Sequence, residues 1–431
     1  MLHSNLGING AGHLTLAGVD TVEMAKKYGT PLYLLDEDRV RANCRTYLSA
    51  MKEYFGGASG PLLASKALSF KGIYRIAAEE GMRTDLVSLG EMFTAHAAGF
   101  PLENAYFHGN NKTDHDIEAA MRYGVGTFVV DNREELLAIN RIAGEQGKVQ
   151  NILLRLTPGI DPHTQEKIST GKVDSKFGTA IETGQAEELT ALALSLSSVR
   201  LLGFHCHVGS QIFEETPFTD AADIMLAFMA CVRDRFGYTA TVLNLGGGFG
   251  VRYTEDDPVI DYRANIRLVA EHVKARCEEY RFPMPEVLME PGRSIVADAG
   301  LTLYTVGSVK TITGYKSYVS VDGGMPDNPR YALYGSRYTA CLASNMNAPC
   351  DFVATVAGRC CESGDLIGED MAMARPSRGD ILAVLVTGAY NFSMASNYNR
   401  IPRPPLVLLT DGADRLGVRG ESYEDLYRLD I

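Results

Sequence analysis

The sequence predicts an α/β protein in which a (β/α)8 barrel is followed by a second, all-β domain of barrel or sandwich type. From Pro61 to Gly292 a short apolar run alternates with an amphipathic helical pattern, and eight such runs occur. After Gly300 the helical periodicity almost disappears, and β-branched or alternating runs are separated by Gly, Asp and Pro turns. The chain of 431 residues also exceeds one ordinary compact core, so two domains are expected.

The eight apolar runs of the first region are predicted to be strands. Near-continuous apolar strands that alternate with helices are typical of parallel strands buried on both faces. Eight such units favour a closed barrel, in which the catalytic groups lie at the C-terminal ends of the strands. The expected strands are 61–67, 83–88, 104–109, 126–131, 151–158, 201–209, 241–248 and 286–292.

The segments between these strands include clear helical patterns. Apolar residues recur there at i, i+3 and i+4, which places them on one face of a helix. Such a face can cover a sheet. Helices are expected at 70–81, 113–124, 132–147 and 260–281.

The all-β domain is expected to draw strands from both ends of the chain. The predicted organisation is an N-terminal segment over 1–37 that contributes to the β domain, a barrel over 38–285, and a C-terminal β domain over 286–431. The strands expected for the β domain are 13–18, 31–36, 301–313, 315–324, 350–358, 380–390 and 405–412.

Composition and charge exclude several classes of partner. Lys and Arg number 41 against 53 Asp and Glu, a net charge of −12, so neither nucleic acid nor an anionic membrane is expected to bind. No apolar run of 18 residues occurs, and the N-terminus lacks the pattern of a secretory signal. The eight cysteines are scattered without a CxxC pair, which is typical of reduced thiols in a cytoplasmic protein.

Lys66 closes the first predicted strand, in PLLASKA. A lysine inside an apolar strand is unfavourable unless it is paired or used covalently. Two interpretations remain open from the residues alone. Either the strand turns to solvent at this point, or Lys66 is a buried amine that forms a Schiff base with a carbonyl group.

His205 and His207 lie two residues apart at the end of the sixth predicted strand, in GFHCHVG. On a strand they would share one face. They could form half of a metal site, pack as hydrogen-bonded imidazoles, or include one ring that stacks on a flat cofactor. No third histidine or acidic ligand stands at convincing spacing, so no metal site is predicted.

The seventh and eighth predicted strands end in NLGGGFG and EPGR. Consecutive glycines let backbone N–H groups approach a phosphate closely, and barrels commonly bind phosphate after strands seven and eight. Glu290 places a carboxylate at the same end, where it could keep a pyridinium nitrogen protonated. Together with Lys66 these features predict a site for pyridoxal 5'-phosphate. The residues that would converge on its phosphate are Ser210, Gly246, Gly247, Gly248, Gly292 and Arg293.

Ten motifs also occur in one order along nearly the whole chain, from GTPLYLLDEDRV to NYNRIPRPPLVLL. On these motifs the sequence resembles the diaminopimelate decarboxylases, which belong to the fold-type III pyridoxal-phosphate enzymes. The resemblance implies a carboxy-lyase that converts meso-2,6-diaminopimelate to L-lysine and CO2, the last step of lysine biosynthesis. The motifs are ASKAL, DLVSLGE, FHGNNK, ISTGKVDSKFG, HCHVGSQ, NLGGGFG, EPGR, DNPRYALYG, CESGD and GAYNFSMASNYN.

The resemblance implies a role for individual residues. Lys66 would bind the cofactor covalently, His207 would stack on its ring and Glu290 would pair with the ring nitrogen. Ser210 and the glycines would hold the phosphate. The substrate would be bound by Arg293, Arg330, Tyr334, Glu362 and Tyr390, of which Arg293 and Tyr390 would also contact the cofactor.

The stretch GRCCESGD places Cys360 beside Cys361. Neighbouring residues of a strand point to opposite faces, so the two thiols are not expected to serve one site. The resemblance implies that Cys361 is the proton donor and that its loop serves the partner subunit of a homodimer. A thiol is mostly protonated at neutral pH and can donate that proton. Cys360 has no assigned role, and Leu63 stands where the family often carries tyrosine.

The choice of substrate follows from its charges. Meso-diaminopimelate carries an ammonium and a carboxylate group at its non-reacting end. Arg293 and Arg330 could bind the carboxylate bidentately, and Glu362 could bind the ammonium. Three alternatives remain open: an enzyme of the same fold that acts on another amino acid, an inactive relative that binds a partner, and a metal-dependent barrel hydrolase.

Overall fold

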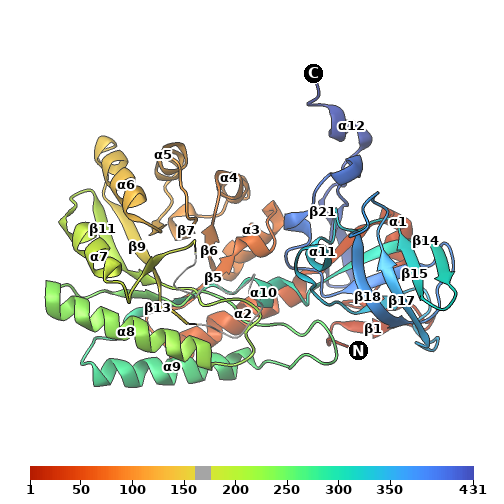
Figure 1. Cartoon of the computed structure of the whole chain (residues 1–431), viewed down its shortest axis with the longest axis horizontal. Coiled ribbons are helices and arrows are strands. Elements are labelled where there is room, and N and C mark those ends of the chain that lie inside the picture. Colours follow the sequence, from red (N-terminus) through yellow and green to blue (C-terminus); the bar gives the residue numbers. More distant parts are fainter. Residues whose placement is uncertain (161–175) are drawn as a thin grey trace. The chain divides into compact units, whose positions relative to one another are not determined.

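The computed structural model describes residues 1–160 and 176–431, and the chain divides into two compact units (Figure 1). The barrel unit comprises Cys44–Gly250 and Ile260–Gly292. The β unit comprises Met1–Asn43, Val251–Val259 and Arg293–Ile431. The chain therefore starts in the β unit, builds the barrel with one excursion to the β unit at Val251–Val259, a segment that the sequence placed in the barrel, and ends in the β unit.

Eight parallel strands close the barrel. From β5 (Gly60–Ala64) the hydrogen-bonded order runs through β6, β7, β8, β9, β11, β12 and β13, and β13 pairs back to β5. All eight predicted strands are confirmed. The other bounds are β6 Arg83–Leu86, β7 Ala105–Phe107, β8 Thr127–Val130, β9 Gln150–Thr157, β11 Val199–His205, β12 Val242–Asn244 and β13 Glu286–Met289, and the short β10 Thr179–Ala180 pairs with β9.

The centre of the barrel is a packed core. Buried apolar side chains from six of the strands contact one another there, because strands buried on both faces have no polar side. The ends of the strands are consequently where polar groups can gather. The cluster consists of Leu62, Tyr106, Val129, Leu153, Val242 and Leu288.

Helices surround these strands, and the four predicted helices are confirmed (Figure 1). Local signals set their ends: a capping box between Thr113 and Asp116 starts α5, the Asn132 side chain caps α6, and Gly81 ends α3 in the left-handed conformation. The bounds are α2 Glu37–Tyr54, α3 Lys71–Glu80, α4 Leu89–Ala97, α5 Asp114–Arg122, α6 Arg133–Glu145, α7 Gln185–Ser195, α8 Thr216–Phe236 and α9 Tyr262–Glu279.

The β unit is organised around the long strand β14 (Gly300–Ile312), which pairs with β15, β19 and β4. The predicted strand at 31–36 is β4 (Leu32–Asp36) and joins this sheet, whereas the segment 13–18 contributes β2 to a separate three-stranded sheet. The remaining bounds are β1 Leu6–Ile8, β2 Leu14–Leu16, β3 Val19–Asp20, β15 Lys316–Val321, β16 Ala340–Leu342, β17 Phe352–Ala357, β18 Leu366–Met373, β19 Ile381–Leu385, β20 Leu406–Thr410 and β21 Ala413–Val418, with helices α1 Thr21–Tyr28, α10 Arg293–Val296, α11 Arg330–Tyr334 and α12 Tyr423–Tyr427.

The two boundaries of the barrel lie later in the chain than residues 38 and 285, where the sequence placed them. Strand β13 hydrogen-bonds to β12 and β5, so residues 286–292 belong to the barrel unit and not to the C-terminal domain. At the other boundary, α2 begins in the β unit and the division falls between Asn43 and Cys44. Among the described residues, no helix combines the length and the apolar character that crossing a membrane requires.

Candidate functional site

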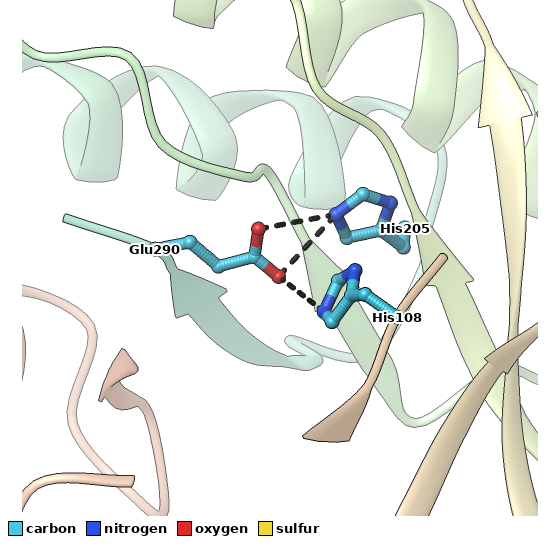
Figure 2. A group of neighbouring side chains, drawn as sticks. All are labelled: His108, His205 and Glu290. Carbon is cyan, nitrogen blue, oxygen red and sulfur yellow. Dashed lines mark hydrogen bonds and ion pairs between the residues drawn. The ribbon is translucent and has the colours of Figure 1, made fainter. Parts of the chain in front are cut away.

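The carboxylate of Glu290 is buried at the C-terminal end of β13 and contacts side chains from three other strand ends, of which His108 and His205 are drawn in Figure 2. Asn244, the last residue of β12, donates its Nδ2–H to Oε1 at 2.8 Å. The Nε2 atom of His205, the last residue of β11, lies 3.3 Å from Oε1 and 3.4 Å from Oε2. His108, directly after β7, places Nε2 at 3.1 Å from Oε1.

Burial and mutual contact shift the pKa values of Glu290, His205 and His108. Burial raises the pKa of Glu290, but the interactions with His108 and His205 outweigh it and hold that pKa well below its usual range. Burial lowers the pKa of His205 to about 4 and also lowers the pKa of His108. The lowered pKa of Glu290 places the negative charge of this group on its carboxylate.

The sequence showed no third histidine or acidic metal ligand at convincing spacing from His205 and His207, and the structure corrects this. His108, His205 and Glu290 bring three ligand-type atoms within 4.8 Å of one another. Sequence spacing could not show this, because each residue comes from a different strand and only barrel closure brings the strand ends together. His205 and His207 do not act on the same group: the imidazole of His205 faces Glu290, whereas His207 lies after the end of β11.

His207 is held by the backbone of the neighbouring loop. The N–H of Gly247 donates to Nδ1 of His207 at 3.2 Å. Burial lowers the pKa of His207 well below its usual range, and the charges of Lys66 and Arg155 act in the same direction. A neutral imidazole that accepts at Nδ1 carries its proton on Nε2, so the hydrogen bond selects one tautomer.

The three consecutive glycines pack tightly against the neighbouring strand ends. A Cβ atom on Gly246 would lie 2.5 Å from the Cys206 carbonyl oxygen, and one on Gly248 would lie 2.5 Å from the Gly209 carbonyl oxygen. Gly246 and Gly248 also have φ angles of +70° and +126°. This close backbone packing is a reason for glycine that the sequence interpretation, based on phosphate alone, did not include. Ser210 follows Gly209 and so lies beside the same loop.

Lys66 lies in a short 3-10 turn, Ser65–Ala67, that follows β5. Its side chain is exposed, so the expectation of a buried amine inside a strand is wrong for this structure. The backbone N–H of Ser65 donates to Oδ1 of Asp85 at 2.8 Å, which anchors the turn. Gly292 lies against the same turn, since a Cβ there would be 2.7 Å from that of Ala64.

The β unit contains a second group of the expected residues. The guanidinium groups of Arg293 and Arg330 each lie 4.9 Å from the ring centroid of Tyr390. Arg330 also lies 5.0 Å from the ring centroid of Tyr334, and Arg293 donates to the hydroxyl of Tyr253 at 2.7 Å. Both arginines are buried, so this unit holds two desolvated cations around one aromatic ring.

The Cys360–Cys361 pair lies in the loop between β17 and β18, not in a strand, so the expected alternation of faces does not apply. Buried Asp365 holds this loop by accepting the N–H of Cys360 at 2.7 Å and that of Met325 at 2.5 Å. Burial raises the pKa of Cys360 to about 12, with Asp365 adding to the effect. Cys361 and Glu362 are exposed. All eight cysteines are free thiols.

The sequence interpretation missed several polar residues at the barrel ends. The rule that strand ends carry the chemistry would have found them, because each lies in the last residues of a strand or directly after it. Three of them lie on strands whose ends carried no predicted site residue, and Asn244 directly precedes the glycines that were singled out on its strand. The missed residues are Asp85 of β6, His108 after β7, Arg155 of β9 and Asn244 of β12.

Comparison with known proteins agrees with these features. Residues 37–297 match the family model described as pyridoxal-dependent decarboxylase, pyridoxal binding domain. The chain is 44% identical to the diaminopimelate decarboxylase of Bacillus subtilis (strain 168) over 430 residues, covering 100% of this chain and 98% of that protein. The diaminopimelate decarboxylase of Halalkalibacterium halodurans is 46% identical over 432 residues, with the same coverage.

Solved structures give the same result. The diaminopimelate decarboxylase of M. jannaschii in complex with L-lysine superposes with a TM-score of 0.92 at 33% identity, covering 100% of this chain and 98% of that one. A lysine/ornithine decarboxylase from Vibrio vulnificus, complexed with putrescine, has a TM-score of 0.75 at 25% identity, covering 90% and 97%. The chain therefore belongs to the diaminopimelate decarboxylase family of pyridoxal-dependent decarboxylases.

Proposed function

We propose that the chain decarboxylates meso-2,6-diaminopimelate to L-lysine and CO2 with pyridoxal 5'-phosphate as cofactor. The observation that carries this proposal is the carboxylate of Glu290, which is buried at the strand ends among His108, His205 and Asn244. A buried negative charge of this kind is unfavourable until a cation pairs with it. The protonated ring nitrogen of the cofactor is such a cation.

The other residues of the barrel unit fit the same cofactor. The N–H of Gly247 donates to His207, and the Cα of Gly247 lies against the carbonyl of Glu290. The backbone of this glycine therefore joins the residue expected to stack on the cofactor ring to the residue expected to pair with its nitrogen. Gly248 lies against the residue before Ser210. Gly292 lies against the turn that carries Lys66.

Each residue then has a defined task. Lys66 would hold the cofactor covalently through its exposed amine, and His207 would support one face of the ring. Ser210 with Gly246, Gly247 and Gly248 would bind the phosphate, and Glu290 would hold the proton on the ring nitrogen. When bound, the cofactor supplies an electron sink for the electron pair that the departing carboxylate leaves.

The arginine pair of the β unit would select the substrate. Arg330 is buried, and its Nε has no hydrogen-bond partner within residues 1–160 and 176–431. A buried guanidinium group whose N–H donors lack partners favours the binding of an anion. Its planar pair of N–H groups matches the two oxygens of a carboxylate. Arg293 adds a second buried cation, and Tyr390 separates the two. Glu362 would bind the ammonium group of the same end of the substrate, and Tyr334 would line the site beside Arg330.

Cys361 would return a proton to the carbon that loses CO2. Its thiol is exposed, whereas burial and Asp365 raise the pKa of Cys360 to about 12, which fits an inert neighbour. We further infer a homodimer in which this loop completes the partner's site, an arrangement that the exposure of Cys361 and Glu362 supports. The free state of all eight cysteines supports a cytoplasmic location.

The visible spectrum of the purified protein, before and after addition of meso-diaminopimelate, tests the proposal. We expect a band from bound cofactor that changes with substrate, release of CO2 and a borohydride-stable adduct on Lys66. Lysine, ornithine and arginine are the comparison substrates. Turnover of one of these, without turnover of meso-diaminopimelate, would reject the substrate, and an adduct elsewhere or none at all would reject the site.

A second candidate, a metal-dependent barrel hydrolase, is favoured by one observation, the His108–His205–Glu290 group. Two histidines and a carboxylate are a familiar ligand set for zinc. The separations of 3.1 to 3.4 Å also suit direct contacts between imidazole and carboxylate without an ion. Elemental analysis decides: stoichiometric metal without a cofactor band would establish the hydrolase and exclude the decarboxylase.

A further inference from the structure

We propose that His108 and His205 are positioning residues, which fix the orientation of the Glu290 carboxylate and keep its negative charge available to the ring nitrogen of the cofactor. The inference rests on the proposed function, because it assigns Glu290 to that nitrogen. It concerns two residues that neither the sequence motifs nor the family resemblance provided with a role. Figure 2 shows how both imidazoles point at the carboxylate.

The contacts distinguish the two oxygens of Glu290. Oε1 has the three shortest contacts: a hydrogen bond from Asn244 at 2.8 Å, and the Nε2 atoms of His108 at 3.1 Å and His205 at 3.3 Å, of which the His108 atom makes no hydrogen bond within the described residues. Oε2 has the 3.4 Å contact with His205. The carboxylate is thus hydrogen-bonded at Oε1 by Asn244 and at Oε2 by His205, and His108 lies against Oε1. Rotation of the side chain would break all three contacts at once.

Both imidazoles face the carboxylate through Nε2. Burial lowers the pKa of His205 to about 4, and Nδ1 of His205 has no partner in the described part of the chain. A neutral ring that donates from Nε2 and leaves a bare lone pair at Nδ1 fits these facts, since an unpaired buried N–H would cost more. Glu290 keeps its negative charge beside this ring.

Other charged groups also act on this cluster. Arg155 of β9 contributes a positive charge that faces both Asp131 and Glu290, and Asp85 of β6 contributes a carboxyl whose pKa burial raises well above its usual range. Lys112 forms an ion pair with Glu135, in which Nζ lies 2.8 Å from Oε1. Burial raises the pKa of Cys206 to about 12, so this neighbouring thiol is neutral.

The position of one proton follows from this arrangement. Donors to the charged form of a carboxyl group favour that form and make it a weaker base. With His108 and His205 in place, the proton between Glu290 and the ring nitrogen remains on the nitrogen. Without them, the carboxylate turns or takes up the proton, and the ring withdraws electrons less strongly.

Matched substitutions in the holoenzyme test the inference. His108→Leu and His205→Leu remove the imidazole contacts with Glu290 at similar volume, whereas His108→Gln and His205→Gln keep a polar amide at nearly the same place. With 15N-labelled cofactor, the ring-nitrogen shift should move toward the unprotonated value in the leucine variants and stay in place in the glutamine variants. The kcat of the leucine variants should fall about 10- to 100-fold with KM nearly unchanged, and glutamine should restore most of it.

The outcomes separate this inference from the proposed function. Absence of the adduct on Lys66 in the wild-type enzyme would reject the function itself. An intact adduct with an unchanged 15N shift and kcat in both leucine variants would overturn only the role of the histidines. If the leucine variants do not fold, 15N-histidine spectra of the wild-type holoenzyme still decide: the inference requires a neutral Nε2–H tautomer of His205 between pH 6 and 8, and a protonated or Nδ1–H ring would contradict it.

Discussion

The backbone of Gly247 lies directly against the carbonyl group of Glu290: a Cβ atom on Gly247 would be 2.0 Å from that carbonyl oxygen. The N–H of the same glycine donates to His207, and the N–H of Glu290 donates to the carbonyl of Gly246 at 2.9 Å. The ends of β12 and β13 therefore form one backbone unit that fixes an imidazole and a carboxylate relative to each other.

Gly247→Ala should disrupt this unit. No side-chain movement can relieve a clash with backbone, so the free energy of unfolding should fall by about 2 kcal/mol or more. Urea unfolding and the cofactor content of the purified variant measure the effect. Gly60→Ala is the control, because a Cβ on Gly60 would meet nothing within 4 Å. Equal stability of the two variants would show that the loops can separate without cost.

Lys66→Ala should abolish the covalent attachment of the cofactor without unfolding the protein, because the Lys66 side chain is exposed and leaves no cavity. The visible band and the borohydride adduct should both disappear, while the circular dichroism spectrum stays the same. Lys71→Ala removes another exposed lysine, at the start of α3, and should retain both signals. A persistent adduct in Lys66→Ala would place the attachment on another amine.

Cys361→Ala should bind the cofactor normally and lose turnover by about 10²- to 10⁴-fold, the usual contribution of a general acid. Cys360→Ala should stay close to the wild type, because burial raises the pKa of that thiol to about 12 and no donor role is expected. Steady-state kcat of the two variants gives the answer. Comparable turnover in both would mean that the proton comes from elsewhere.

Arg330→Met should weaken substrate binding, because it removes the buried guanidinium that lies between Tyr334 and Tyr390. Loss of a charged hydrogen bond to the distal carboxylate predicts kcat/KM about 10- to 100-fold lower, mainly through KM. Arg337→Met removes an exposed arginine of the same unit and serves as the control. An unchanged KM in Arg330→Met would remove this residue from the substrate site.

His205 should make the stability of the protein depend on pH. Its pKa is about 4 in the folded protein and about 6.5 when unfolded, so the unfolded chain binds more protons between these values. The free energy of unfolding should therefore fall as the pH drops from about 6.5 to about 4, by on the order of 3 kcal/mol. The lowered pKa of Glu290 acts in the same direction at the acid end.

His205→Gln should flatten this pH dependence, because glutamine does not titrate. Urea unfolding at pH 7 and pH 5 of the wild type, His205→Gln and His115→Gln measures the difference. His115 is exposed at the start of α5, and its replacement should leave the slope as it is. An equal slope in His205→Gln would show that His205 does not become protonated on unfolding in this range.

Most of the fold could be predicted from the chain because its signals are local. Apolar runs and helical periodicity located all eight barrel strands, and the capping residues Thr113 and Asn132 mark helix starts that the sequence shows. The boundary at 285 failed because the end of a domain depends on which strand hydrogen-bonds to β13, and no local pattern contains that pairing.

The candidate site was predictable only in part. Glycines, Lys66 and Glu290 stand at strand ends, which their position in the sequence reveals. The sequence left open whether Lys66 turns to solvent and did not show the loop position of Cys361, because both depend on where β5 and β17 end in three dimensions.

The sequence by itself determined the barrel, the second β unit and the family, since strand periodicity and motif order are properties of the chain read in one dimension. Only the tertiary structure decided that His108, His205 and Asn244 meet at Glu290. The physical reason is barrel closure: it brings the C-terminal ends of β7, β11, β12 and β13 to one edge, where side chains far apart in the chain share a single buried charge.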